Sequence, residues 1–119
     1  MSQSFPELLD DLNAAIGRLR AGAAEPMRGF SMLAREALKP GALDLKTKEL
    51  IAIAIAVASR CDGCIGFHAK AAIQAGASRE EVLETLSMAI YMGAGPSMIY
   101  AAEALRAFDE LAPAASGNG

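Results

Sequence analysis

The sequence predicts an all-α fold of about six helices, and three features support this. Hydrophobic residues make up 53% of the 119 residues, whereas aromatic residues make up only 5% and Trp is absent. Ala, Leu and Ile lead the apolar class, which favours closely packed helices over a sheet rich in β-branched and aromatic side chains. Apolar residues also recur at helical spacing between breaks made by Gly and Pro.

The first third of the chain is expected to form two helices. The first carries Pro6 in its first turn and runs to about residue 20, and Gly22 ends it. The second starts near Pro26 and ends at Leu38, because the segment Lys39-Pro40-Gly41 breaks it.

Residues 45–59 form the one ambiguous segment. Four β-branched residues alternate with alanines there, as they would in a strand: Ile51, Ile53, Ile55 and Val57. A helix is favoured because the alternating partners are Ala, the best helix former, and residues 45–49 suit a solvated first turn. Asp44 offers the N-cap. A helix that is apolar all round is expected to be buried.

The second half of the chain is expected to hold three more helices. The fourth covers residues 62 to 74 or 75, and Gly76 closes it. The fifth opens with the capping box Ser78-Arg79-Glu80-Glu81. The segment Gly93-Ala94-Gly95-Pro96 interrupts it, and a sixth helix begins at Pro96 and ends near Leu111.

One domain, residues 1–112, is expected, followed by a disordered tail at residues 113–119. Four apolar residues near its last break could line the site or an interface, and as apolar helix residues they are expected in the core by default: Tyr91, Met92, Met98 and Tyr100. The mean hydropathy of +0.27 is high for a small soluble domain. An apolar surplus that one small core cannot hide indicates an oligomer, because subunit interfaces resemble a core cut in half.

Charge and hydropathy exclude two classes of partner. The net charge is −3 and no basic stripe is present, so no nucleic acid is expected as a partner. The longest apolar run, residues 50–58, falls short of the roughly 20 residues that span a bilayer, so no membrane is expected. The N-terminal segment has neither the basic nor the apolar region of a signal peptide. A cytoplasmic location follows, where structural disulfides are rare.

The pair Cys61 and Cys64, with His68 downstream, predicts a thiol–disulfide redox site. At 100° per residue, the three side chains share one helix face within roughly 60°. A helix N-terminus favours the reactive thiolate, and His68, the only histidine, can act as general base. The second cysteine then closes the disulfide. Gly63 and Gly66 are expected to leave room around the sulfurs.

Other interpretations of the cysteines stay open. Both thiols could be small buried hydrophobes. Zinc could bind Cys61, Cys64 and His68, but this set is one ligand short of four unless Glu49, a water or a neighbouring subunit completes it. We expect no metal and no other cofactor. The attacking cysteine also stays open: the helix mouth favours Cys61 as the exposed one, whereas spacing to His68 favours Cys64 as the deprotonated one.

The pattern of Glu49, eleven residues, Cys61-x-x-Cys64, three residues and His68 resembles the AhpD-like alkylhydroperoxidase branch of the carboxymuconolactone decarboxylase superfamily. The likeness is strongest over about residues 43–95. It implies an all-helical domain that assembles as homotrimers or homohexamers. It also implies a relay in which Glu49, His68 and ordered water activate one cysteine. The substrate would be a hydroperoxide or a disulfide, with a thiol protein as possible electron donor.

Two points qualify the resemblance. Twelve residues of helix would place Glu49 about 18 Å from Cys61. It reaches the site only if the chain turns between Ser59 and Asp62, so that the fourth helix folds back along the third; otherwise it is a solvated first-turn Glu. Some relatives carry His where this chain has Gly63, which puts a proton path through that imidazole in doubt.

Two alternative functions remain from the sequence. A carboxymuconolactone decarboxylase-like lyase would act on a lactone carboxylate, and members of that branch do without the redox Cys-x-x-Cys. No Arg cluster marks a carboxylate pocket, although Arg28, Arg35 and Arg60 could converge in three dimensions. A non-enzymatic helical oligomer with a redox-sensing or metal-binding Cys pair is the other alternative.

Overall fold

The structure, a computed structural model, describes residues 3–113 and confirms the all-α prediction. The described residues hold no strand. Five helical elements follow one another along the chain: α1 (Phe5–Gly22), α2 (Ala24–Leu38), α3 (Leu45–Ala58), α4 (Asp62–Gln74) and α5 (Arg79–Leu111). The ambiguous segment is therefore helical, as α3. Residues 114–119 of the predicted tail lie outside the described residues.

The predicted helix ends are confirmed by their caps. The Asp44 carboxylate accepts a hydrogen bond from the Thr47 backbone N–H at 2.8 Å, which starts α3. Ser78 and Glu81 form the expected capping box at the start of α5. Gly76 has φ +91°, a conformation that glycine adopts without strain, and it follows the end of α4.

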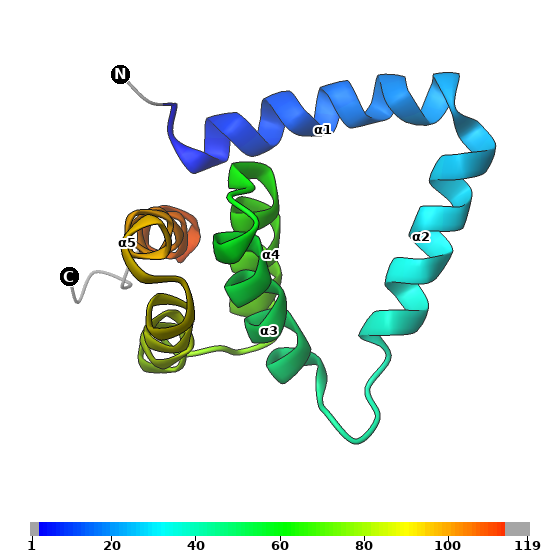
Figure 1. Cartoon of the computed structure of the whole chain (residues 1–119). Helices are drawn as coiled ribbons and strands as arrows, with labels where there is room; N and C mark the ends of the chain where they lie inside the picture. The colour runs from blue at the N-terminus through cyan, green and yellow to red at the C-terminus, as the bar shows by residue number, and fades with distance from the viewer. Residues whose placement is uncertain (1–2, 114–119) are drawn as a thin grey trace.

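Helices α3, α4 and α5 form the body of the molecule (Figure 1). Their shared core is built around large side chains that are less than 2% exposed: Phe5, Ile53, Val57, Ile65 and Val82. Helix α1 contributes Phe5 and packs on α4 and α5. Helix α2 stands apart in Figure 1 and has no buried residue, so α1 and α2 form an arm beside the body.

Gly63 and Gly66 do not leave room around the sulfurs, as the sequence suggested; they let α1 approach α4. A Cβ atom at Gly63 would lie 2.8 Å from Leu12 Cδ1. At Gly66 it would lie 2.8 Å from Leu9 Cδ2 and 2.9 Å from Phe5 Cδ1. The space beside both glycines is therefore filled by α1, and α1 is held close to the cysteine-bearing end of α4.

The predicted break at residues 93–96 is confirmed, because two helical stretches of α5 meet across a kink at Ala94. Divided at this kink, α5 corresponds to the fifth and sixth predicted helices. Ala94 leaves the helical conformation, with φ 57° and ψ −142°, and Pro96 follows it. Pro96 cannot continue the hydrogen-bond ladder, so the chain bends there and resumes a helix to Leu111.

Neighbouring substitutions at this kink are expected to have opposite effects on stability. A Cβ at Gly93 would lie 2.7 Å from Ser97 Cβ, so Gly93→Ala should destabilise the fold by about 1–3 kcal/mol. Ala94 holds a positive φ that favours glycine, so Ala94→Gly should stabilise it by about 1 kcal/mol. Chemical unfolding of both variants measures whether each change raises or lowers the free energy of unfolding. Equal destabilisation by both would contradict the strained conformation of Ala94.

Four apolar residues were expected in the core, and three of them are on the surface. Tyr91 is 78% exposed, Met92 77% and Met98 53%; Tyr100 is partly buried against the core. Helix α3 is not buried all round either, because Ile55 is 59% exposed. Met92 and Ile55, both exposed, line the same surface hollow between α3 and α5.

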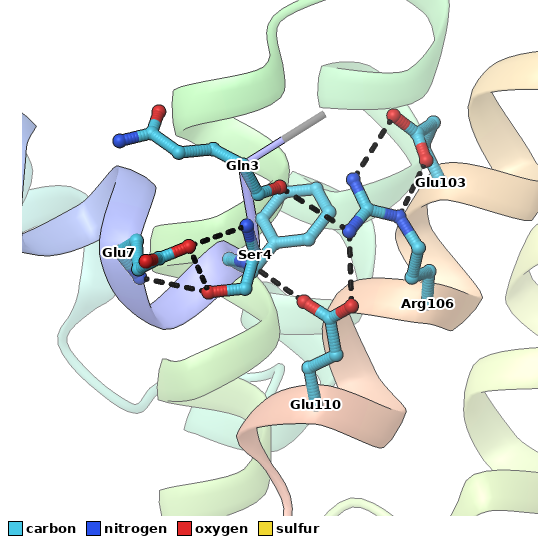
Figure 2. A network of polar contacts seen from close by, with 7 residues as sticks. Gln3, Ser4, Glu7, Glu103, Arg106 and Glu110 are labelled. Carbon is cyan, nitrogen blue, oxygen red and sulfur yellow. Dashed lines mark hydrogen bonds and ion pairs between the residues drawn. The ribbon is translucent and has the colours of Figure 1, made fainter. Parts of the chain in front are cut away.

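A polar network fastens the start of α1 to the end of α5 (Figure 2). The Phe5 backbone N–H donates to Glu110 at 2.7 Å, and Arg106 donates to the other Glu110 oxygen at 2.9 Å. Arg106 also donates to Glu103 at 2.8 Å and lies 4.6 Å from the centre of the Phe5 ring. These contacts hold the base of the arm on the body.

The network makes stability depend on pH. Hydrogen bonds from the Phe5 N–H and then from Arg106 lower the pKa of Glu110. A carboxylate with a lowered folded-state pKa stabilises the fold above its unfolded pKa, and this stabilisation is lost as pH falls through the folded pKa. The melting temperature should therefore fall between about pH 5 and pH 3, and less steeply in Glu110→Gln.

Scanning calorimetry across this pH range tests the prediction. At neutral pH, Glu110→Gln should already melt below the wild type because a charge-assisted bond is lost. Glu84→Gln, which alters an exposed carboxyl of α5, is the matched control and should follow the wild-type curve. Parallel curves for wild type and Glu110→Gln would show that Glu110 makes no contribution.

Within residues 3–113, none of the helices combines the length and the hydropathy that crossing a bilayer requires.

Candidate redox site

The two cysteines form a disulfide at the N-terminus of α4. Their Cα atoms lie 5.2 Å apart. Cys61 is the N-cap residue, and its Sγ accepts a hydrogen bond from the Cys64 backbone N–H at 3.2 Å. The first turn of the helix therefore directs at Cys61 Sγ an N–H group that has no acceptor within the helix. This environment favours a thiolate after reduction.

The turn between α3 and α4 decides which residues meet at this site. Arg60 adopts φ +56°, and the Cys61 N–H donates to the Ala56 carbonyl at 3.1 Å, so the chain reverses within three residues. Helices α3 and α4 then lie side by side (Figure 1). This is the turn that Glu49 needs in order to approach the cysteine-bearing helix.

Glu49 and His68 are brought together across the two helices. Glu49 Oε1 lies 2.7 Å from His68 Nδ1. Glu49 is only 4% exposed, whereas the His68 side chain is 35% exposed. A buried carboxylate requires a partner, and here the imidazole supplies it. When Nδ1 donates its proton to the carboxylate, Nε2 is left with a free lone pair that can accept a proton.

The exposure of the two cysteines is the reverse of what the sequence predicted. Cys64 is exposed and Cys61 is half-buried, whereas the helix mouth favoured Cys61 as the exposed one. Cys61 is the N-cap residue, and its sulfur lies against the backbone N–H of Cys64 in the first turn of α4. A bulky reactant therefore reaches Cys64 more readily.

A groove of about 570 Å³ runs past the disulfide between the arm and α4. Apolar side chains form most of its walls: Leu12, Ile16, Phe30 and Phe67. Its polar lining consists of Asn13, Arg20 and His68, beside both cysteines. The groove brings the sulfurs, the imidazole and an apolar surface to one place.

The sequence did not indicate that α1 and α2 would border the site. Their apolar residues predicted only amphipathic helices. The available signal was the pair Gly63 and Gly66, which are three residues apart on α4 and mark a close helix approach. Among the described residues that line the groove, Arg20 is the only arginine; Arg28, Arg35 and Arg60 do not converge there. Arg28 instead pairs with Glu25 at 2.8 Å.

The predicted zinc ligands do not form a ligand set in this state of the protein. Cys61 and Cys64 are bonded to each other. Across residues 3–113, no three His, Cys, Asp or Glu side chains are grouped so that they could share a metal ion.

Comparisons with known proteins agree with this architecture. The model of the carboxymuconolactone decarboxylase family matches residues 24–107. An apo crystal structure of a protein of that family from Legionella pneumophila is 54% identical, with a TM-score of 0.91, and the match covers 94% of this chain and 100% of that one.

More distant relatives extend the comparison. A Thermotoga maritima protein of the same family, for which a part in the antioxidative response has been suggested, is 32% identical with a TM-score of 0.73. That match covers 92% of this chain and 90% of the other. An uncharacterized protein of Cupriavidus necator is 37% identical over 111 residues, which is 93% of this chain and 98% of the relative.

Proposed function

Because the chain belongs to the carboxymuconolactone decarboxylase family, we propose that it is a thiol-dependent antioxidant enzyme of the AhpD-like type. It reduces hydroperoxides, or a disulfide of a partner protein, with the pair Cys61 and Cys64. The observation that carries this proposal is the disulfide at the wall of an apolar groove that His68, paired with Glu49, also lines.

The oxidative half of the reaction begins at Cys64. His68 Nε2 takes the thiol proton, and the Cys64 thiolate attacks the terminal oxygen of the hydroperoxide. The O–O bond breaks, the alkoxide takes a proton to leave as an alcohol, and Cys64 becomes a sulfenic acid. Cys64 is assigned this role because it is the exposed sulfur and is four residues from His68.

Cys61 completes the reaction. Its sulfur attacks the Cys64 sulfenic acid as the Cys61 thiol gives up its proton, the S–O bond breaks, and the hydroxyl takes that proton and leaves as water. The pair has then given two electrons to the peroxide and is the disulfide of this structure. A thiol donor attacks exposed Cys64 to form a mixed disulfide, and Cys61 leaves as a thiolate held by the helix cap. A second donor thiol then attacks the donor sulfur, which releases Cys64 as a thiol and leaves the donor as a disulfide.

The Glu49–His68 pair orients the base. A carboxylate that holds Nδ1 fixes the imidazole tautomer and leaves Nε2 for the thiol proton. Such positioned proton transfer contributes about 10²–10⁴-fold to a rate. Glu49 therefore acts through His68 as a positioning residue.

A thiol count tests the proposed activity. The reduced protein should lose two thiols and two hydrogen atoms per chain on reaction with one equivalent of hydroperoxide, and dithiothreitol should restore both. A variant with both cysteines replaced by Ser controls for peroxide consumed elsewhere. Two thiols that do not react, or that become reactive only with a chelator, would contradict the peroxidase proposal and support a structural or metal-bound pair.

Assembly and location form part of the same proposal. A homotrimer or homohexamer would cover the large apolar side chains that one chain leaves exposed, including Phe30, Leu33, Tyr91 and Met92. Light scattering coupled to size exclusion measures the assembly. A reducing compartment such as the cytoplasm would supply thiols that return the pair to its dithiol form.

A further inference from the structure

We propose that the groove selects hydroperoxides that carry an anionic head group on an apolar chain, with Arg20 binding the head group. This inference rests on the proposed function and specifies its substrate class. The groove joins three features that such a molecule matches: an oxidisable sulfur pair, an apolar wall and a separate cation.

The apolar wall accounts for the chain. Residues of three helices supply it, with Leu12 and Ile16 from α1, Phe30 from α2 and Phe67 from α4. Phe30 is 64% exposed although it is a large aromatic residue. Hydrocarbon placed against these side chains would remove apolar surface from water, which favours binding.

Arg20 accounts for the head group. It lies in the last turn of α1 and has no ion-pair partner among residues 3–113. In that part of the chain, no Asp or Glu lines the groove. A guanidinium without a carboxylate partner beside an apolar wall is suited to bind a carboxylate or phosphate. The helix dipole alone would favour a cation at this position, so the presence of Arg20 there does not by itself indicate a ligand. The distance from Arg20 to the sulfurs decides which substrates could contact both.

The distance along α1 sets the length of the chain. Leu12 packs beside Gly63, between the two cysteines, and Arg20 follows eight residues later. Eight residues of helix span about 12 Å, and a helical side chain leans back toward the N-terminus. An extended alkyl chain zigzags, so each carbon advances the chain by somewhat less than the C–C bond length of about 1.5 Å, and roughly six to ten carbons would then separate the head group from the peroxide.

Substrate comparison tests the inference. The 9-hydroperoxide of linoleic acid, its methyl ester and tert-butyl hydroperoxide are compared by kcat/KM, with dithiothreitol as the reductant. The wild type should prefer the acid to the ester by about tenfold or more, mainly through KM. Arg20→Gln should reduce this preference toward one. Arg18→Gln, which alters an exposed cation of α1 that does not line the groove, should retain it.

The possible outcomes distinguish the proposed substrate selectivity from the proposed peroxidase activity. Turnover with no preference for the acid overturns the selectivity and leaves the peroxidase in place. No turnover of any hydroperoxide overturns the peroxidase and the substrate class together. Calorimetry with decanoate and the oxidised protein measures the Arg20 contact without catalysis: binding should weaken about tenfold in Arg20→Gln, and equal binding by both proteins would exclude Arg20 as the anion site.

Discussion

Replacing Cys64 by Ser is expected to abolish hydroperoxide turnover, with kcat/KM reduced by more than about a thousandfold. The serine hydroxyl keeps the size of the thiol but is not a nucleophile at neutral pH. Cys64 is the exposed cysteine at the groove, and half-buried Cys61 is not expected to take over its attack on the peroxide. Peroxide consumption in the presence of dithiothreitol measures the loss.

Cys61→Ser is the matched comparison and should behave differently. Cys64 can still attack the first equivalent of hydroperoxide, so one oxygen atom should be added to the protein and no intramolecular disulfide should form. Mass spectrometry distinguishes this product from a disulfide. If Cys61→Ser is inert and Cys64→Ser accumulates the oxygen adduct, the roles of the two sulfurs are reversed. Melting of both variants in reductant shows whether either change merely unfolds the protein.

The elements that the sequence predicted well are those that local chemistry decides. Asp44 and Ser78 lie directly before the helices that they cap, and Pro96 directly follows the break at Ala94 and Gly95. The face shared by Cys61, Cys64 and His68 needs only the helical repeat. These features depend on residues fewer than eight positions apart, and a single sequence contains that information.

Most of the mispredicted features depend on contacts between distant segments, and the exposure of the two cysteines is the local exception. Apolar character placed Tyr91 and Met92 in the core, but hydropathy does not distinguish a core from a surface that another molecule could cover. The order of exposure of Cys61 and Cys64 was wrong because the N-cap hydrogen bond of Cys61 was not considered. The groove required the packing of α1 on Gly63, which no local pattern specifies.

The contact between Glu49 and His68 could be predicted only in part. Nineteen residues separate the two. Their meeting depends on the backbone of Arg60, a non-glycine residue at positive φ that sequence does not readily predict. The resemblance to the AhpD-like branch implied that Glu49 belongs to the relay, but it did not show how the backbone brings Glu49 to His68. The structure shows the turn that brings the two side chains together, and the part that Glu49 plays in catalysis remains a prediction.

Glu49→Gln is expected to lower kcat/KM for hydroperoxide by about 10–100-fold while the cysteines remain oxidisable. Gln has the shape of Glu, but its amide has no charge and can face Nδ1 with either oxygen or nitrogen. The imidazole would then no longer be held in the tautomer that leaves Nε2 free. His68 is the only histidine, so nitrogen NMR reads its tautomer without overlap. Glu84→Gln, on the exposed face of α5, should leave both the rate and the spectrum unchanged.

The double variant Glu49→Gln/His68→Gln shows whether the two residues act as one unit. If Glu49 works only by orienting His68, its replacement should have no further effect once His68 is Gln, and the two single effects should not add. Additive losses would mean that Glu49 acts on the thiol by a route of its own. An unchanged rate in Glu49→Gln, with the tautomer altered, would show that the 2.7 Å contact is structural and that the base lies elsewhere.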